Sequence, residues 1–220
     1  MIKAAKNGVP TTIARIGQLA GSRRNGAWNI TDWFPLIIKA ATSLRVLPAL
    51  DVDMSVTWIP VDVAAQTVSL YPLLISYPSV LSRCQILELA LLPSVELQQQ
   101  QVFHVAHPYP TTWNVVITEV KRLLDSNGRS VELISFESWI QRLRDLSKYP
   151  ETVHQAPVIK LLPFFEERIL AQKQDSSFKE ALGFARVELI ATTERSQKLS
   201  NVNPITKLDV ANWLDYWQLH

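Results

Sequence analysis

Cysteine and glycine are scarce in this sequence, and each shortage excludes a kind of site. Cys84 is the only cysteine among 220 residues, so neither an internal disulfide nor a cysteine-rich zinc site can form. Six glycines occur, and none of them contributes to a Gly-x-Gly-x-x-Gly pattern. A dinucleotide phosphate loop needs closely spaced glycines because its backbone must approach the pyrophosphate. The sequence therefore contains no such loop.

An excess of charge and a long apolar run are also missing. The 22 basic and 20 acidic residues leave a net charge of +2, and this balance predicts no nucleic-acid partner. The most apolar run, residues 68–81, is too short to span a bilayer and is interrupted by Pro72 and Pro78. The chain also begins without an apolar signal core. We therefore expect a cytoplasmic protein with no membrane partner, and its 47% hydrophobic content suffices for a globular core.

Residues 8–21 form the stretch around which the rest of the chain is interpreted. A β-branched run follows Pro10 and predicts a strand that ends at Gly17, where the backbone must turn. In a parallel α/β sheet, ligands bind at the carboxyl end of such a strand. From the residues alone, an ordinary turn between strand and loop is the alternative.

Two further patterns predict where helices begin. Thr31 and Asp32 are expected to cap a helix that continues to about Leu44. Residues 55–60 predict one short apolar strand, after which Asp62 can cap a second helix. For Asp62, a purely structural cap is the alternative to a position beside a substrate.

Several of these stretches resemble one enzyme family. Residues 14–21, Ala-Arg-Ile-Gly-Gln-Leu-Ala-Gly, resemble the strand after the catalytic helix of extended short-chain dehydrogenase/reductases. More narrowly, they resemble the NAD-binding, male-sterility-like thioester reductase domain of fungal adenylate-forming reductases and related non-ribosomal-peptide-synthetase-like enzymes. Pro60-Val61-Asp62, residues 102–108 and the helix expected over residues 159–170 add separate matches. His107 stands where that family usually has asparagine.

The resemblance implies an α/β fold that is only part of a domain. We expect the carboxyl-terminal portion of a Rossmann-like extended short-chain dehydrogenase/reductase domain, with an incomplete sheet and a small, mostly helical substrate-binding subdomain. Residues 1–67 would hold the last Rossmann strands and helices, and residues 86–220 the remaining sheet strand and the substrate-binding subdomain.

Residues 68–85 interrupt this pattern. The segment has neither helical nor alternating periodicity, and its removal joins residues 64–67 to 86–93 as one well-formed helix. It is interpreted either as a translated intron or as a loop insertion specific to this protein. Sequencing of the spliced messenger RNA distinguishes the two, because reads that all retain the segment exclude the intron.

The resemblance also implies a reaction and a set of site residues. The family uses NADPH to reduce a carrier-bound acyl thioester to an aldehyde or alcohol, so the implied partners are a phosphopantetheinyl carrier domain and the missing amino-terminal part of the reductase domain. Cofactor contacts are expected at Ile16, Gly17, Gln18 and Leu19. Substrate contacts are expected at Trp28, Asn29, Trp33, Val61 and Asp62. For the tryptophans, a place in the core is the alternative.

The groups that perform the chemistry in that family are absent. None of the five tyrosines is followed by lysine four residues later, so the Tyr-x-x-x-Lys pair is missing and we predict no catalytic residue. His104 and His107 are three apart along a predicted strand and so point to opposite faces, and no metal site is expected. The chain is expected to be a fragment that is inactive alone. The alternative is a free-standing, non-catalytic module that binds a carrier protein or another partner.

Overall fold

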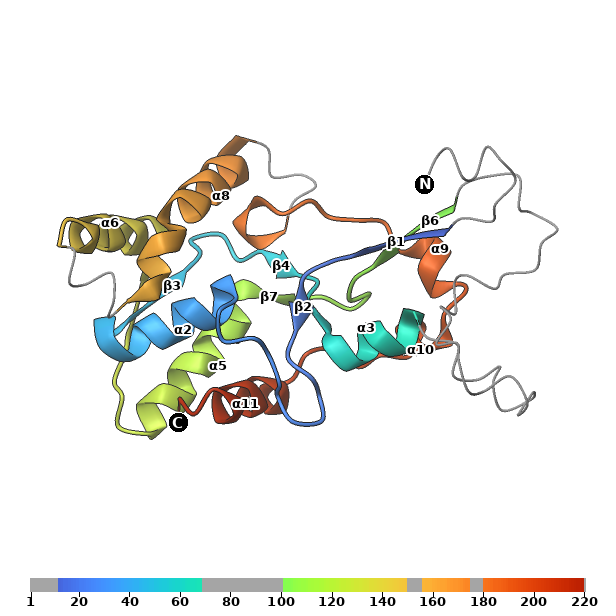
Figure 1. The fold of residues 1–220 in the computed structure, drawn as a ribbon, viewed down its shortest axis with the longest axis horizontal. Coiled ribbons are helices and arrows are strands. Elements are labelled where there is room, and N and C mark those ends of the chain that lie inside the picture. The colour runs from blue at the N-terminus through green and yellow to red at the C-terminus, as the bar shows by residue number, and fades with distance from the viewer. Residues whose placement is uncertain (1–11, 69–100, 150–155, 175–179, 220) are drawn as a thin grey trace. The chain divides into compact units, whose positions relative to one another are not determined.

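The computed structural model describes residues 12–68, 101–149, 156–174 and 180–219, which form short strands and helices (Figure 1). Four two-stranded pairs occur in this part of the chain, three of them parallel. The segment predicted as an insertion, residues 68–85, lies outside the described residues except for Val68, which ends a helix. The α/β class that was predicted is confirmed, and no helix in the described part is both long and apolar enough to cross a membrane.

The chain divides into two compact units. Unit 1 comprises Met1–Ala20, Thr57–Tyr109 and Val187–Pro204, and unit 2 comprises Gly21–Val56, Pro110–Arg186 and Ile205–His220. Each unit takes segments from distant parts of the chain, and the predicted division of the sequence into three consecutive stretches stays a prediction.

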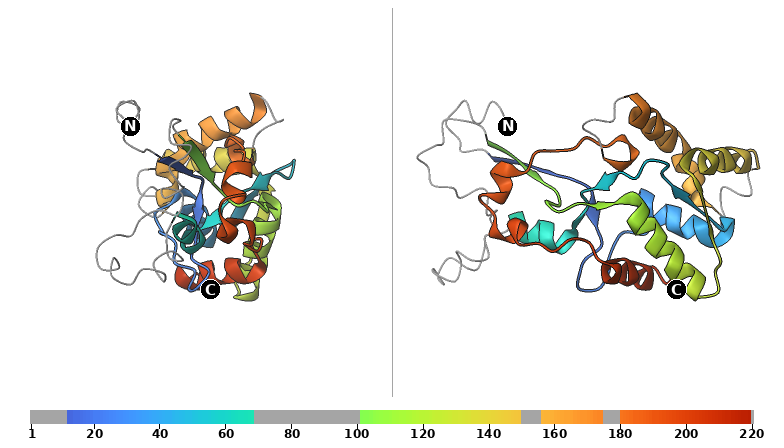
Figure 2. Two further views of the ribbon diagram at one scale, coloured as in Figure 1. Left: turned by 90° about the vertical axis from the view of Figure 1, so that its right-hand side faces the viewer. Right: turned by 180° about the vertical axis from the view of Figure 1, so that it is seen from behind.

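Unit 1 is built on parallel strands. β1 (Thr12–Ile16) pairs with β6 (Gln101–Val105), and the two lie side by side in Figures 1 and 2. β2 (Leu19–Ala20) pairs with β5 (Ile59–Pro60). The helices are α3 (Val61–Val68), α9 (Ile190–Thr193) and α10 (Gln197–Ser200).

The core of unit 1 lies on one face of these strands. Phe103 and Val105 alternate along β6 and therefore share a face, which packs against Ala64 of α3 and Leu199 of α10. The Arg195 guanidinium lies 5.2 Å from the centroid of the Phe103 ring. α3 begins directly after β5, at the carboxyl end of that strand, and this packing holds the helix against the strands.

Unit 2 contains most of the helices. They are α2 (Trp33–Leu44), α5 (Trp113–Ser126), α6 (Phe136–Ser147), α8 (Leu162–Gln174) and α11 (Lys207–Tyr216), with 3-10 helices η4 (Pro157–Leu161) and η5 (Ala181–Gly183). Its strands are β3 (Val46–Ala49), β4 (Ser55–Val56), β7 (Thr111–Thr112) and β8 (Glu132–Ser135). β3 and β8 are parallel, β4 and β7 are antiparallel, and α2, α5 and α6 contact β3.

The core of unit 2 is aromatic. Trp113 is fully buried at the start of α5, stacks on Trp33 with ring centroids 6.1 Å apart, and donates a hydrogen bond from its indole N–H to the Pro48 carbonyl oxygen at 2.9 Å. Trp213 of α11 meets the Trp28 ring edge-on at 5.1 Å. Large rings bury much apolar area, and such ring pairs add stabilisation beyond that burial.

Three sequence predictions about local structure are corrected. Residues 55–60 do not form one strand, because β4 pairs with β7 of unit 2 whereas β5 pairs with β2 of unit 1. Asp62 is the second residue of α3, so it lies within the first helical turn rather than before it. Its carboxylate still favours the positive end of the helix dipole. Asp32 is the N-cap of α2 by position, but its side chain accepts a hydrogen bond from the Trp28 indole instead of capping.

A buried carboxylate in unit 2 predicts a pH dependence of stability. Glu119 on α5 is almost inaccessible and accepts hydrogen bonds from the Arg122 guanidinium at 2.6–3.1 Å, which lower the pKa of Glu119 below its ordinary value. A carboxyl whose pKa is lower in the folded state stabilises the fold above its unfolded pKa, and this contribution is lost as the pH falls through the folded pKa.

We therefore expect Glu119→Gln to lower the denaturant midpoint more at about pH 7 than at about pH 3, because the contribution declines as the pH falls toward the folded pKa. Asp145→Asn is the matched control, because the Asp145–Lys148 pair is exposed and exposed pairs contribute little. Equal losses for Glu119→Gln at both pH values would contradict the electrostatic explanation.

Candidate functional site

The predicted cofactor edge lies where two parallel strands of unit 1 part. The last bond between the strand segments runs from the Gly17 N–H to the Val105 carbonyl at 2.8 Å. Beyond this bond, residues 57–59 form hydrogen bonds to the segments that follow β1 and β6. The Ile59 N–H donates to the Gln18 carbonyl at 3.0 Å, and the His107 N–H donates to the Thr57 carbonyl at 2.9 Å. The segment leading into β5 therefore lies between the diverging ends of β1 and β6.

Gly17 allows a close approach at this point. A Cβ atom on Gly17 would lie 3.2 Å from the Ala106 Cβ, which is tighter than ordinary van der Waals contact. Gly17 itself is exposed, and the Ile16 side chain beside it is 47% exposed, although it is a large apolar group. The Gln18 side chain is half-buried and donates from Nε2 to the Leu19 carbonyl at 2.8 Å. The edge thus presents exposed backbone at Gly17 next to the apolar side chain of Ile16.

Val61 and Asp62 follow β5 at the same edge. Leu19 pairs in register with Ile59, two residues before Val61, so the structure brings the segments of Leu19 and Val61 together within unit 1. Val61 is 38% exposed and Asp62 is half-buried in the first turn of α3. These positions suit contact with a ligand at the carboxyl ends of β2 and β5.

Trp28 and Asn29 lie in unit 2 and serve local structure. Trp28 is only 5% exposed, with ring neighbours Phe34, Trp213 and Trp217. The Asn29 side-chain oxygen accepts bonds from the N–H and the hydroxyl of Thr31, which form the turn that leads into α2. A substrate contact by either residue stays a prediction.

Trp33 differs from Trp28 because its ring is only half-buried. It is the first residue of α2 and stacks nearly parallel on Trp113. The rings of Phe164 and Phe184 lie 6.3 and 6.0 Å from it. Trp33 therefore combines an orientation set by stacking with incomplete burial, the combination that an apolar wall of a binding site requires.

A hollow in unit 1 was not predicted from the sequence. It has a volume of about 320 Å³ and lies between β6 and α9, where the Thr192 hydroxyl donates to the His104 carbonyl at 2.7 Å. Alternation along β6 places Val102 and His104 on one face, which is the one signal in the sequence that could have indicated it. The lining residues are Val102, His104, Glu188, Ile190, Ala191, Thr192 and Glu194. Within the described ranges, no group of three or more His, Cys, Asp or Glu side chains is arranged to hold a metal ion.

Comparisons with known proteins agree with this α/β architecture. Residues 1–68 match the family model of an NAD-binding domain described as male sterility protein. The whole chain is similar to the adenylate-forming reductase Nps11 of Serpula lacrymans var. lacrymans (strain S7.9), with 28% identity over 96% of this chain and 18% of that protein. The predicted resemblance to the reductase domains of adenylate-forming reductases is thereby confirmed.

Solved structures extend the likeness to the fold. The terminal R domain of the myxalamid PKS-NRPS biosynthetic pathway matches 98% of this chain and 46% of its own, with a TM-score of 0.60 and 16% identity. A thiolation-reductase di-domain from an archaeal non-ribosomal peptide synthetase matches 99% of this chain and 38% of its own, with a TM-score of 0.56 and 18% identity. The chain thus spans less than half of each solved protein and about a fifth of the curated relative.

Proposed function

We propose that this chain forms the carboxyl-terminal part of an NADPH-dependent thioester reductase domain in the cytoplasm. The domain would reduce an acyl group, carried on phosphopantetheine, to an aldehyde or alcohol. The observation that carries the proposal is the edge at Ile16–Leu19, where β1 and β6 part and residues 57–59 bond to both sides. Such an edge lies at the carboxyl ends of parallel strands, where this class of fold binds its ligands.

The residues at this edge suit one end of the cofactor. Exposed backbone at Gly17 permits close approach, and the accessible Ile16 side chain offers apolar contact to a flat ring. NADPH, when bound, supplies a hydride to the carbonyl carbon of the substrate. No part of the chain suits the diphosphate, because the glycine-rich loop is absent from the sequence. Nicotinamide contacts are therefore proposed here, and phosphate contacts are not.

Substrate contacts are proposed at Val61 and Asp62 in unit 1 and at Trp28, Asn29 and Trp33 in unit 2. Trp33 is the best supported of the unit 2 residues, because its ring is oriented by stacking and the residue is only half-buried. An apolar wall of this kind would orient an acyl chain and keep water from it. The proposed partners are a phosphopantetheinyl carrier domain and the amino-terminal part of a reductase domain. The name of the solved thiolation-reductase di-domain supports the first of these.

Joining the amino-terminal part of the Nps11 reductase domain to this chain tests the proposal. We expect the chain alone to oxidise no NADPH with an acyl pantetheine thioester, because it lacks both the phosphate loop and the Tyr-x-x-x-Lys pair. The joined protein should oxidise NADPH and release an aldehyde or alcohol. A joined protein that is folded but inactive, while the chain alone binds a carrier protein, would favour the non-catalytic module instead.

The size of the native polypeptide provides a second measurement. An antibody against α11 should detect a band in cell extract far larger than 24.9 kDa if the chain works as part of a longer reductase. A single band at 24.9 kDa would count against that arrangement.

A further inference from the structure

His107 is a buried polar residue for which the proposed reaction provides no role. It follows the carboxyl end of β6 and is 1% exposed. Its neighbour Ala106 is the residue that Gly17 approaches at the proposed cofactor edge. A buried imidazole is costly unless its ring nitrogens are hydrogen-bonded, so its partners are informative.

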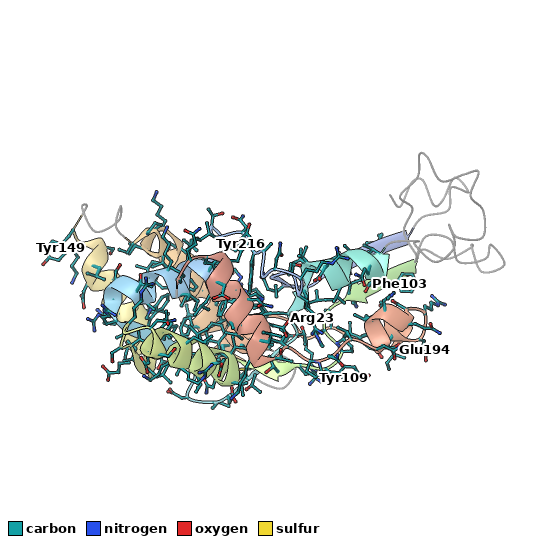
Figure 3. The ribbon with its side chains drawn as sticks, turned by 90° about the horizontal axis from the view of Figure 1, so that it is seen from below. Arg23, Phe103, Tyr109, Tyr149, Glu194 and Tyr216 are labelled. Carbon is teal, nitrogen blue, oxygen red and sulfur yellow. The ribbon has the colours of Figure 1, made fainter. Side chains whose placement is uncertain are left out.

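Both ring nitrogens have partners in unit 1. The Tyr109 N–H donates to Nδ1 at 3.1 Å, so Nδ1 must be an acceptor. In a neutral imidazole the proton is then on Nε2, which lies 2.9 Å from the Asn203 carbonyl and donates to it. Tyr109 is labelled in Figure 3, and its hydroxyl donates to the Ser200 carbonyl at 2.9 Å. The hydrogen bonds therefore require the neutral ring with its proton on Nε2.

These partners come from segments that lead from one unit to the other. The chain passes between the units at five places. At three of them, a residue that is hydrogen-bonded to His107 lies at the passage or one residue from it. Thr57, whose carbonyl accepts from the His107 N–H, is the first residue after one passage. Tyr109 is the last residue before a second passage. Asn203 directly precedes Pro204, which is the last residue before a third passage. His107 thus links three connecting segments at their ends in unit 1.

We infer that His107 is a positioning residue that ties these three connections to the carboxyl edge of β6. The inference rests on the proposed function, in which residues 16–19 of unit 1 contact the nicotinamide. The neutral imidazole holds the connections at Tyr109 and Asn203, and the His107 backbone N–H holds the one at Thr57, beside the backbone of Gly17 and Ala106. It acts through Tyr109 and Asn203 and does not itself touch the reacting atoms.

Two measurements on the full chain test this role. Nitrogen-15 NMR of the imidazoles at about pH 7 should identify His107 as neutral and protonated on Nε2. A ring protonated on Nδ1, or on both nitrogens, overturns the inference. Hydrogen exchange followed by mass spectrometry then compares His107→Ala with His107→Gln. The glutamine amide nitrogen can take the place of Nε2 and donate to Asn203, whereas alanine cannot.

We expect His107→Ala to speed exchange about fivefold in peptides covering residues 106–110 and 200–204, because each of these segments loses one bond to the imidazole and one lost bond corresponds to a factor of about five. His107→Gln should restore slow exchange around residue 203. His104→Gln is the matched control on the same strand and should leave these peptides unchanged. If glutamine exchanges like alanine, or if α5 of unit 2 is affected equally, His107 is only a packing residue and the inference fails. An inactive joined reductase would reject the proposed function, whereas these measurements would stand.

Discussion

Replacing Gly26 with alanine is expected to destabilise unit 2 by about 3 kcal/mol or more, because two separate costs add. Gly26 has a φ angle of +68°, a conformation that residues with a side chain adopt at a cost. In addition, a Cβ at this position would lie 1.9 Å from the backbone oxygen of Asn212 in α11. Neither backbone can yield freely, since Gly26 closes a turn through its bond to the Ser22 carbonyl at 2.7 Å.

Gly128→Ala is the matched control for this substitution. Gly128 also has a positive φ, +74°, but a Cβ there would meet no atom within 4 Å. Its replacement therefore costs only the conformational strain, about 1 kcal/mol. Urea unfolding of both variants, followed by tryptophan fluorescence, measures the difference. Equal midpoints for the two variants would contradict the close approach of Gly26 to α11.

The turn around Gly26 also positions an aromatic residue that the sequence marked as a candidate. Gly21 lies so close to Trp213 that a Cβ would be 2.4 Å from its ring, and Arg23, labelled in Figure 3, lies 3.8 Å from the Asp209 carboxylate. The turn that leads to Trp28 therefore rests on α11, a helix from the other end of the chain, beside α5 in Figures 1 and 2. This explains why Trp28 is buried, which its neighbours in the sequence could not reveal.

Local patterns predicted the elements of regular structure well. The β-branched run before Gly17 is β1, and the helix predicted from Asp32 to about Leu44 is α2. The end of α5 follows local sequence in the same way, because Asn127 caps it and Gly128 follows with positive φ. These features depend on residues close together in the sequence. Propensity and capping therefore suffice to find them.

Pairing between strands could not be predicted in the same way. Residues 55–60 read as one strand because their apolar character is continuous, yet Ser55 pairs with Thr112 and Ile59 with Leu19. The choice of partner depends on contacts between residues far apart in the sequence. The same limit applied to His107, whose hydrogen bond to Asn203 was not foreseeable from the residues around it in the sequence.

The candidate site was predicted mainly through the resemblance and only partly through the residues. Gly17 was indicated by its place at the end of a strand, and the structure provides the reason for a glycine in its contact with Ala106. Asp62 was expected to cap α3 and instead lies within its first turn. Contacts of these residues with cofactor or substrate stay predictions.

Trp113→Ala is expected to cost about 3–5 kcal/mol and to unfold unit 2 under mild conditions. The indole is fully buried, so its loss leaves a large cavity, and the Pro48 carbonyl loses the bond from the indole N–H. Trp113→Phe keeps a six-membered aromatic ring, loses the hydrogen bond and leaves a smaller cavity than alanine does, so it should cost less than Trp113→Ala. Thermal unfolding measured by near-ultraviolet circular dichroism provides the comparison.

Trp33→Ala distinguishes a role in the core from a role at the site. Trp33 stacks on Trp113 but is only half-buried, so its removal should cost about 1–2 kcal/mol and leave the fold intact. If Trp33 forms a wall for the acyl chain, the joined reductase carrying Trp33→Ala should have a raised KM for the thioester and an unchanged KM for NADPH. Trp33→Phe should restore the thioester KM because it keeps an aromatic surface there. A loss of stability as large as that of Trp113→Ala, with no change in KM, would make Trp33 a core residue and remove it from the proposed site.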